Sequence, residues 1–446
     1  MTFSAACLGA VLEAQVPAGA TGLVVALSGG ADSASLLIAV SALGSAFRGL
    51  SVRAVHVDHG LQPAASGFRQ ACAALCSELN IPLAVISVTV QTASGVSVEA
   101  AARDARYAAL QAELRPGECL LTAHHALDQA ETLLLQALRG SGLKGLSAMP
   151  LCRPFGHGWH LRPVLEVPQE ELLEFGARSS APSIADPMNE DLRFDRNYLR
   201  RQVWPRIEAR WPGSAIALSR AARHAAEAQE LLDRAAAVQV CRLRDGEALS
   251  VPGLRALRES ERTNALRFWL SDSGVEPPST ARLTEALRQI LDAQDDHLPA
   301  IVWGGRSLRR YRQRVFITDA EPPRLEGTRS WRVESGSRID LGPNLGTLCW
   351  VAQAGGLDAA RLPHSLIVRG RDGGESLRPA PKAKTQTLQH LCQSYGVLPW
   401  MRDALPLVFA DDALIAVADL WLDAPRRAGA GSPGLEIRWD EAPIIV

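Results

Sequence analysis

The chain has 446 residues, more than one ordinary hydrophobic core organises, so its length predicts two or three domains. Its 47% hydrophobic and 21% charged residues and its formal net charge of −1 are typical of soluble globular proteins and exclude a disordered or membrane protein. No apolar run reaches the roughly 18 residues of a membrane span, and the first residues lack the basic start of a signal peptide. We therefore expect a cytoplasmic protein with no membrane partner.

The cysteine and lysine contents limit the possible chemistry. The eight cysteines are scattered and include no C-x-x-C pair, so neither a disulfide framework nor a zinc or iron–sulfur site is indicated. Only three of the 47 basic residues are lysines. A phosphate bound near the N-terminus must therefore be held by backbone amides, arginine or a metal ion.

The first part of the chain alternates short apolar runs with helical patterns, which is typical of parallel βαβ units. The expected strands are 23–27, 52–57, 83–88 and 119–123, and the expected helices are 33–47, 64–80 and 97–114. This order predicts a doubly wound α/β domain with a parallel sheet. Such sheets bind ligands beyond the carboxyl ends of their strands.

The pattern changes after residue 211. A long Ala-rich helix is expected first, then further helices, and then strand-like segments at 299–305 and 314–318. A Pro- and Gly-containing segment, 319–330, is expected to be a linker before a tail rich in β-branched residues. We predict three domains: a doubly wound domain at 1–211, a mainly helical domain at 212–320 and a small α+β domain at 331–446.

The string LVVALSGGADSASLL, residues 23–37, places a glycine-rich turn between the first strand and the first helix. Such a turn presents successive backbone N–H groups to an anion, and the helix dipole adds positive potential there. The lysine of a Walker loop is absent, and no G-x-G-x-x-G follows the strand. The plainer alternative is an ordinary glycine turn with a helix N-cap at Asp32 or Ser33.

Residues 28–33, S-G-G-A-D-S, resemble the S-G-G-x-D-S loop of the PP-loop ATP pyrophosphatase superfamily. The resemblance implies that the loop grips the phosphates of ATP while a substrate oxygen attacks the α-phosphate, giving an adenylated intermediate and pyrophosphate. It makes Asp32 a catalytic residue that also holds Mg²⁺. The implied ATP-binding residues are Ser28, Gly29, Gly30, Ala31, Asp32 and Ser33.

Two further strings, HVDHGLQP at 56–63 and the segment 122–149, resemble those of the tRNA(Ile)-lysidine synthetase family. That family uses ATP and free L-lysine to convert the wobble cytidine of the isoleucine tRNA with a CAU anticodon into lysidine. The resemblance therefore implies a carbon–nitrogen ligase with ATP and Mg²⁺ as cofactors, and with this tRNA and lysine as partners. It leaves the oligomeric state open between a monomer and a homodimer.

Asp128 and Glu131 are three residues apart, and His124 lies one turn earlier, so the three can converge on a helix. As residues alone, they fit equally well as acids favoured by a helix N-terminus, and their spacing is not a standard zinc spacing. The resemblance makes Asp128 and Glu131 catalytic and His125 substrate-binding. The lysine amine, with a pKa of about 10.4, must lose a proton before it attacks. Which carboxylate takes that proton and which holds Mg²⁺ stays open.

One position departs from the family. Many members have two consecutive acids before the glutamine that corresponds to Gln129, whereas Leu127 replaces the first acid here. Asp128 is therefore the acid expected to be needed for catalysis. Glu99, Arg103 and Arg106 fall on one face of a predicted helix, where the plainer interpretation is a solvated Glu99–Arg103 pair; by resemblance, Arg106 lies in the active site and contacts phosphate or stabilises the charge built up during adenylation. The D-P-x-N and R-N-x-x-R patterns imply substrate-binding roles for Asp186, Asn189, Arg196, Asn197 and Arg200.

The tail resembles the C-terminal domain of the longer family members. The implied tRNA-binding residues are Arg369, Arg371, Arg378, Lys382 and Lys384, and the basic run 306–314 is expected to be a second docking surface. Two alternatives remain: a PP-loop tRNA thiolation enzyme and a catalytically inactive tRNA-binding relative. Thiolation commonly needs paired cysteines, whereas Cys72 and Cys76 fit better as packing residues. The intact loop and acids argue against loss of catalysis.

Overall fold

The computed structural model describes residues 2–44, 47–58, 65–89, 98–179, 191–294, 298–429 and 432–445. Contacts divide the chain into two compact units, Met1–Leu232 and Asp233–Val446. The boundary falls within one long helix, α10 (Ser214–Leu243). The division into three domains stays a prediction. Within the described ranges, no helix combines the length and the apolar character needed to cross a membrane.

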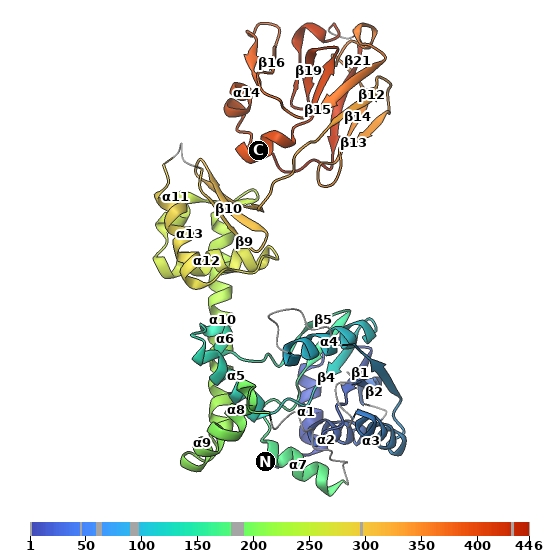
Figure 1. Cartoon of the computed structure of the whole chain (residues 1–446), viewed down its shortest axis with the longest axis vertical. Coiled ribbons are helices and arrows are strands. Elements are labelled where there is room, and N and C mark those ends of the chain that lie inside the picture. Colours follow the sequence, from blue (N-terminus) through green and yellow to red (C-terminus); the bar gives the residue numbers. More distant parts are fainter. Residues whose placement is uncertain are drawn as a thin grey trace. The chain divides into compact units, whose positions relative to one another are not determined.

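The first unit is built on a six-stranded sheet (Figure 1). In sheet order its strands are β3 (Leu83–Ser87), β2 (Ser51–Asp58), β1 (Gly22–Ala26), β4 (Glu118–Leu121), β6 (Gly158–Leu161) and β5 (Cys152–Phe155). All neighbours pair in parallel except β5, which runs antiparallel to β6 at the edge. The doubly wound sheet and its four expected strands are confirmed. The hairpin β5–β6 was not expected, because Pro154 and Gly158 interrupt its apolar pattern. The edge strand β5 tolerates the proline, and Gly158 of β6 allows a close approach to β4, where a side chain would meet the Glu118 carbonyl oxygen at 2.0 Å.

Helices cover both faces of this sheet. Leu23 and Val25 of β1 point into a core shared with α1 (Ala5–Gln15), α2 (Ala31–Ser41), α3 (Ala65–Glu78) and α7 (Gln169–Arg178). Val24 points to the opposite face, where α4 (Val98–Glu113) packs, on the far side of the sheet from α2 and α3 in Figure 1. Alternate residues of a strand face opposite ways, so both faces of this apolar strand are buried.

The sheet order fixes where a ligand can bind. β1 lies between β2 and β4, so the chain leaves the carboxyl ends of β1 and β4 at the point where the strand order reverses. The turn after β1 leads into α2, and the turn after β4 leads into α5 (Ala126–Leu138). Two segments about a hundred residues apart therefore meet at one crevice.

A helical segment of three consecutive parts comes after α7 in the chain. It consists of α8 (Asp195–Tyr198), the π-helical turn η3 (Leu199–Val203) and α9 (Trp204–Arg210). Pro205 has no N–H to donate to the carbonyl group one turn before it, which disfavours regular α-helical bonding at this place. The short α6 (Leu143–Leu146) follows α5.

The second unit begins with an antiparallel sheet and three helices. Its strands, in sheet order, are β7 (Arg244–Asp245), β8 (Ala248–Ser250), β11 (Arg314–Asp319), β10 (Arg306–Tyr311) and β9 (Ala300–Trp303). The helices are α11 (Val251–Ala256), α12 (Glu259–Asp272) and α13 (Thr280–Asp292). The expected helices and the strand-like segments of this region are confirmed.

The rest of this unit is rich in strands. One sheet contains β12 (Thr328–Arg332), β15 (Ser365–Arg369), β18 (Leu407–Ala410), β19 (Ala413–Val417) and β20 (Trp421–Leu422). A second contains β13 (Arg338–Asp340), β14 (Thr347–Ala354) and β21 (Pro433–Asp440), and β16 (Ser376–Leu377) pairs with β17 (Gln386–Thr387) before α14 (Leu388–Tyr395). The stacked indoles of Trp331 and Trp350, with ring centroids 4.4 Å apart, join β12 to β14 in one core.

Candidate active site

The glycine-rich turn after β1 is held by its two serines. Ser28 and Ser33 hydroxyls are 3.0 Å apart, and the Ser28 hydroxyl accepts from the Gly30 N–H at 3.3 Å. Gly29 has a φ of +90°, and a side chain there would meet the ring of Phe68 at 2.8 Å. Gly30 is the N-cap of α2 and provides no side-chain cap. The first turn of α2 therefore presents backbone N–H groups, which suits an anion.

The acids after β4 lie on the first turns of α5, as their spacing predicts. His125 is the N-cap, and Asp128 accepts from the His125 backbone N–H at 3.1 Å. The Nε2 atom of His125 lies 3.4 Å from Asp128 Oδ2 and 3.9 Å from Asp32 Oδ2. His125 is buried and stands between a carboxylate of each turn, so the two turns form one site.

Two arginines bind both acids of α5. Arg196 donates from Nη2 to Asp128 Oδ1 at 2.8 Å and from Nε to Glu131 Oε2 at 2.9 Å. Arg200 donates from Nη2 to the same Asp128 oxygen at 2.8 Å and from Nε to Glu131 Oε1 at 2.5 Å. The Glu131 side chain is fully buried, whereas that of Asp128 stays 12% exposed. We call these four residues the carboxylate–arginine cluster.

The carboxylates of the site differ in their electrostatic surroundings. Burial by itself would raise the pKa of Asp128, but the charges of His125, Arg196 and Arg200 outweigh it and hold that pKa below its ordinary value. The pKa of Asp32 is raised, because burial outweighs the effects of His125 and of the Gln169 amide, which donates to Asp32 Oδ1 at 3.3 Å. Asp128 is therefore firmly ionised at neutral pH, and Asp32 is the stronger base.

A chain of hydrogen bonds runs from the sheet to His124. Arg162 Nη2 lies 3.3 Å from His160 Nδ1, His160 Nε2 lies 2.9 Å from the Thr122 hydroxyl, and that hydroxyl lies 2.8 Å from His124 Nδ1. A guanidinium can only donate, so His160 accepts at Nδ1 and donates from Nε2. Thr122 then donates to His124. His124 is thus a neutral ring that carries its proton on Nε2.

These two histidines are expected to make stability depend on pH. Burial, with the nearby charge of Arg162, lowers the pKa of His160 to about 2, and burial lowers the pKa of His124 to about 3. At pH values below about 6.5, the ordinary pKa of histidine, these two side chains bind protons in the unfolded chain but not in the folded chain. As the pH is lowered from about 6.5, the free energy of unfolding is therefore expected to decrease by about 1.4 kcal/mol per pH unit for each histidine. Urea denaturation at a series of pH values measures this slope.

The variant His160→Gln removes one of the two groups and is expected to reduce the slope. His157→Gln is the matched control, because His157 is exposed in the turn between β5 and β6, and it is expected to keep the wild-type slope. An equal slope in wild type and His160→Gln would contradict the neutral hydrogen-bonded chain.

Other predicted residues lie around this centre without direct contact to the acids in the described contacts. Arg106 is half-buried, with its guanidinium 5.5 Å from the Tyr107 ring centroid. Burial lowers the pKa of Arg106; Tyr107 opposes this shift, whereas the charges of Arg103 and Arg196 add to it. Asn197 donates to the Asp191 carbonyl group at 3.0 Å. Asp186 and Asn189 lie outside the described residues.

Several side chains of the site were not predicted. They are Thr122, His160, Arg162 and Gln169. Gln169 is 137 positions from Asp32, and His160 is 38 positions from Thr122. The available signal was Thr122, which follows an apolar run and stands two residues before His124. This signal could not be interpreted before the neighbouring strand β6, which carries His160, was known.

The predicted tRNA-binding residues of the tail fall into two groups. Arg369 lies over the Phe409 ring and donates to the Gly370 carbonyl group, and Arg378 donates to the carbonyl groups of Pro381 and Ala383. These two arginines hold their own loops. Arg371 lines a surface pocket with Arg324, and Lys382 and Lys384 are exposed.

The basic run 306–314 is largely built into the protein. Arg310 is buried and donates from Nη1 to the carbonyl groups of Ile290 and Ala293 at the end of α13, at 2.8 and 2.6 Å. Arg309 donates to Thr318 and Ala320. The expectation that the whole run is a docking surface is wrong for Arg310, because its guanidinium satisfies helix-end carbonyl groups instead.

Three family models match successive parts of the chain. They are a PP-loop domain at residues 7–207, a TilS substrate binding domain at 249–316 and a TilS substrate C-terminal domain at 366–439. Among solved structures, the chain resembles a U34-tRNA thiolase from Methanococcus maripaludis with a TM-score of 0.40 and 14% identity, over 49% of this chain and 76% of that one.

Curated relatives match almost the whole length. A tRNA(Ile)-lysidine synthase of Alkalilimnicola ehrlichii is 40% identical over 405 residues, which cover 90% of each chain. One of Pseudomonas aeruginosa is 40% identical over 423 residues, which cover 92% of each chain, and one of Methylococcus capsulatus is 37% identical over 416 residues, 91% of this chain and 93% of that one. The chain therefore belongs to the tRNA(Ile)-lysidine synthase family.

Proposed function

We propose that this protein ligates L-lysine to the 2-position of the wobble cytidine of the isoleucine tRNA with a CAU anticodon. The observation that carries the proposal is the meeting of the anion-binding turn after β1 with the carboxylate–arginine cluster after β4, in a chain of this family. The reaction needs a place for ATP and a place for an amine side by side. Thiolation has no comparable support, because Cys72 and Cys76 are buried and burial raises the pKa of Cys72 to about 12.

In the first step, the cytidine 2-oxygen attacks the α-phosphorus of ATP, an O–P bond forms, and pyrophosphate leaves. The N–H groups of the first turn of α2 and the hydroxyls of Ser28 and Ser33 bind the phosphates. Arg106 and Arg196 supply positive charge near the site, which stabilises the charge that builds up during the attack.

Mg²⁺ fits this site through Asp32. Its carboxylate is 34% exposed beside the turn, and carboxylate oxygens are ligands that Mg²⁺ prefers. The described residues contain no cluster of three metal-ligating side chains, so the other ligands would be phosphate oxygens and water. Bound Mg²⁺ would neutralise phosphate charge.

In the second step, the lysine ε-amine attacks the 2-carbon and AMP leaves with the oxygen. Both oxygens of Glu131 are bound by arginines and its side chain is fully buried, so it holds Arg196 and Arg200 in place. Asp128 is partly exposed and ionised, and it can bind the incoming ammonium group. Asp32, whose pKa is raised, is the better acceptor for the ammonium proton when it is free of metal.

The tRNA would be bound by cations of the tail, the exposed Lys382 and Lys384 and the half-buried Arg371. A cytoplasmic location is part of this proposal.

The test is to supply the purified protein with ATP, radiolabelled lysine and isoleucine tRNA bearing a CAU anticodon. Lysine is expected to enter the tRNA, with AMP and pyrophosphate released. Methionine tRNA, which has the same anticodon, is the control and is expected to stay unlabelled. Failure to incorporate lysine, with incorporation of sulfur from a sulfur donor instead, would overturn the proposal.

A further inference from the structure

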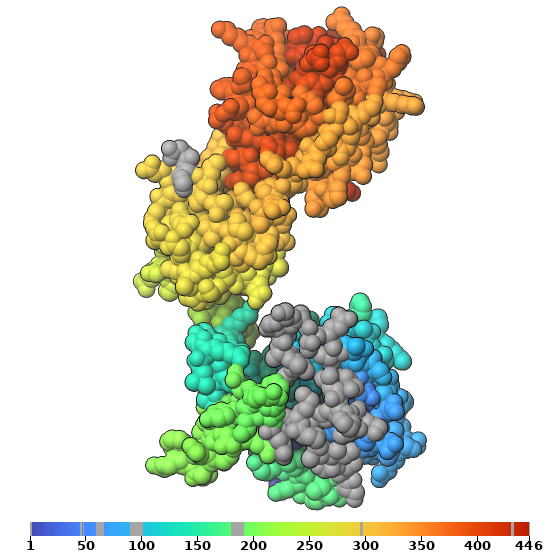
Figure 2. Space-filling model, in the orientation of Figure 1, coloured from blue at the N-terminus to red at the C-terminus, as the bar shows by residue number. Residues whose placement is uncertain are grey.

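The helical segment α8–η3–α9 carries a surface pocket that the proposed chemistry does not use. The pocket has a volume of about 240 Å³ and is lined by Tyr198, Gln202, Val203, Arg206, Ile207 and Trp211. Figure 2 shows this segment, in green, on the surface of the first unit. Tyr198 is 52% exposed and Trp211 is 62% exposed. The Arg210 guanidinium lies 5.7 Å from the centroid of the Trp211 ring, and an exposed apolar patch edged by polar side chains is typical of an interaction site.

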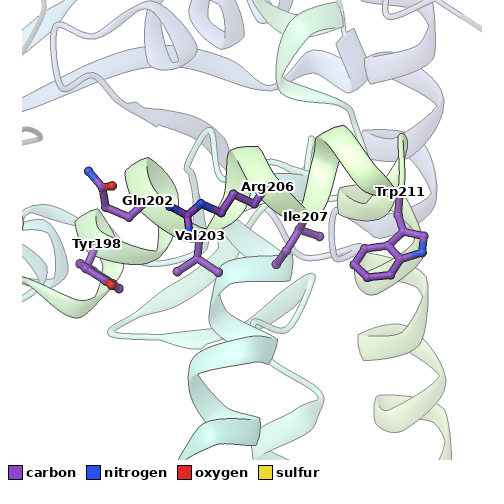
Figure 3. A pocket seen from close by; sticks show the side chains of 6 residues that line it. All are labelled: Tyr198, Gln202, Val203, Arg206, Ile207 and Trp211. Atoms are coloured by element: carbon purple, nitrogen blue, oxygen red, sulfur yellow. The ribbon is translucent and has the colours of Figure 1, made fainter.

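The shape of the pocket is a row rather than a closed cavity. Figure 3 shows Tyr198 and Trp211 at the two ends, with Val203 and Ile207 between them on the same side of the helical segment. The two rings are thirteen positions apart in the chain, which is about 20 Å along a helix. They cannot clamp one ligand ring between them. They can each receive one flat group of an extended ligand.

The charge around the row selects the class of partner. The segment 193–211 contains six arginines and only two acids, Asp195 and Glu208. Three of these arginines already have acidic partners, because Arg193 pairs with Asp191 and because Arg196 and Arg200 bind the acids of the active site. The Glu208 carboxylate of α9 binds the start of α10, because it accepts hydrogen bonds from the Gly213 N–H at 2.6 Å and from the Ser214 hydroxyl at 2.5 Å. Arg206 lines the pocket, is exposed, and has no ion pair among the described residues. A polyanion with flat apolar groups fits this combination.

Single-stranded RNA has both properties, since its bases stack on aromatic rings and its phosphates bind arginine. We propose that the row Tyr198–Trp211 is a stacking surface for unpaired bases of the tRNA substrate, with Arg206 on the phosphate backbone. The inference rests on the proposed function. Its position supports it, because the same helical segment begins with Arg196 and Arg200, which hold the acids of the active site. Bases stacked on the row would lead the target nucleotide toward the site.

The test measures the affinity of the full chain for isoleucine tRNA and for its isolated anticodon stem-loop by filter binding. Trp211→Ala and Tyr198→Ala are each expected to weaken binding roughly 5- to 100-fold, the size of one lost base stack. Trp211→Phe keeps a ring and is expected to stay near wild type. Arg206→Ala is expected to reduce the salt dependence of binding by about one phosphate contact, whereas Trp211→Ala leaves it unchanged.

Leu231→Ala, at a 65% exposed apolar residue of α10 outside the row, is the matched control and is expected to bind RNA normally. Wild-type affinity in both aromatic variants would overturn the inference. So would a change from dimer to monomer in sedimentation with unchanged RNA affinity, since the row would then be a subunit interface. A protein that binds this tRNA through the row without incorporating lysine would refute the proposed function and leave this inference intact.

Discussion

Asp128→Asn is expected to lower the rate of lysine incorporation roughly 100- to 1000-fold, the usual cost of removing one preorganised electrostatic group from an active site. The substitution keeps the shape of the side chain and an oxygen for Arg196 and Arg200, but it removes the negative charge that both arginines share. It also removes the charge that would bind the lysine ammonium group. The measurement is the initial rate with radiolabelled lysine at saturating ATP and tRNA.

Asp195→Asn provides the matched control for this variant. Asp195 lies on α8, one residue before Arg196, but its side chain is 77% exposed and contacts only Arg139, at 3.7 Å in the described contacts. Its loss is expected to leave the rate unchanged. If Asp128→Asn were as active as Asp195→Asn, the charge at position 128 would have no part in the reaction.

The fold of the first unit was largely predictable because its signals are local. Each of the four expected strands is a short apolar run followed by a helix of its own, and 23–27 and 52–57 correspond to β1 and β2. The sequence did not predict the hairpin β5–β6, because Pro154 and Gly158 break the apolar pattern. Pairing with β4 supplies the stability that the local sequence lacks. Tertiary pairing of that kind leaves no trace in a single short segment.

The contacts among the candidate site residues could not be predicted from the sequence, although the placement of some of these residues could. The spacing of Asp128 and Glu131 shows that both lie on one side of α5, and the turn after β1 is recognisable by its letters. That Arg196 and Arg200 bind these acids, rather than a substrate alone, depends on a chain segment 65 or more positions away. Long-range ion pairs need the fold to be known first.

The arginine-rich segments show the same limit. A run such as 306–314 has the composition of a docking surface, yet Arg310 is buried against the end of α13 and Arg309 holds strand β11. Arginine carries five N–H donors and an apolar stem, so it serves equally well to bind carbonyl groups inside a protein. Counting positive residues therefore overstates the surface available to RNA.

Glu131→Gln is expected to impair both stability and activity. The glutamine amide cannot balance two guanidinium groups, so the substitution leaves Arg196 and Arg200 with one carboxylate in place of two. Breaking a buried ion pair by removing one partner costs roughly 3–5 kcal/mol in the free energy of unfolding. Lysine incorporation is expected to fall by roughly 100-fold as the arginines lose their fixed positions. Urea denaturation and the labelled-lysine assay measure the two effects.

Glu227→Gln makes the same chemical change in an exposed ion pair and is the matched control. Glu227 lies on α10 with 55% of its side chain exposed and contacts Arg223 at 3.4 Å, and such surface pairs contribute about 0–1 kcal/mol. A small stability change in both variants would show that Glu131 is not needed to balance the arginines. Normal stability with lost activity in Glu131→Gln would instead make Glu131 a group that contacts the substrate, whereas a joint loss supports its role in holding Arg196 and Arg200 beside Asp128.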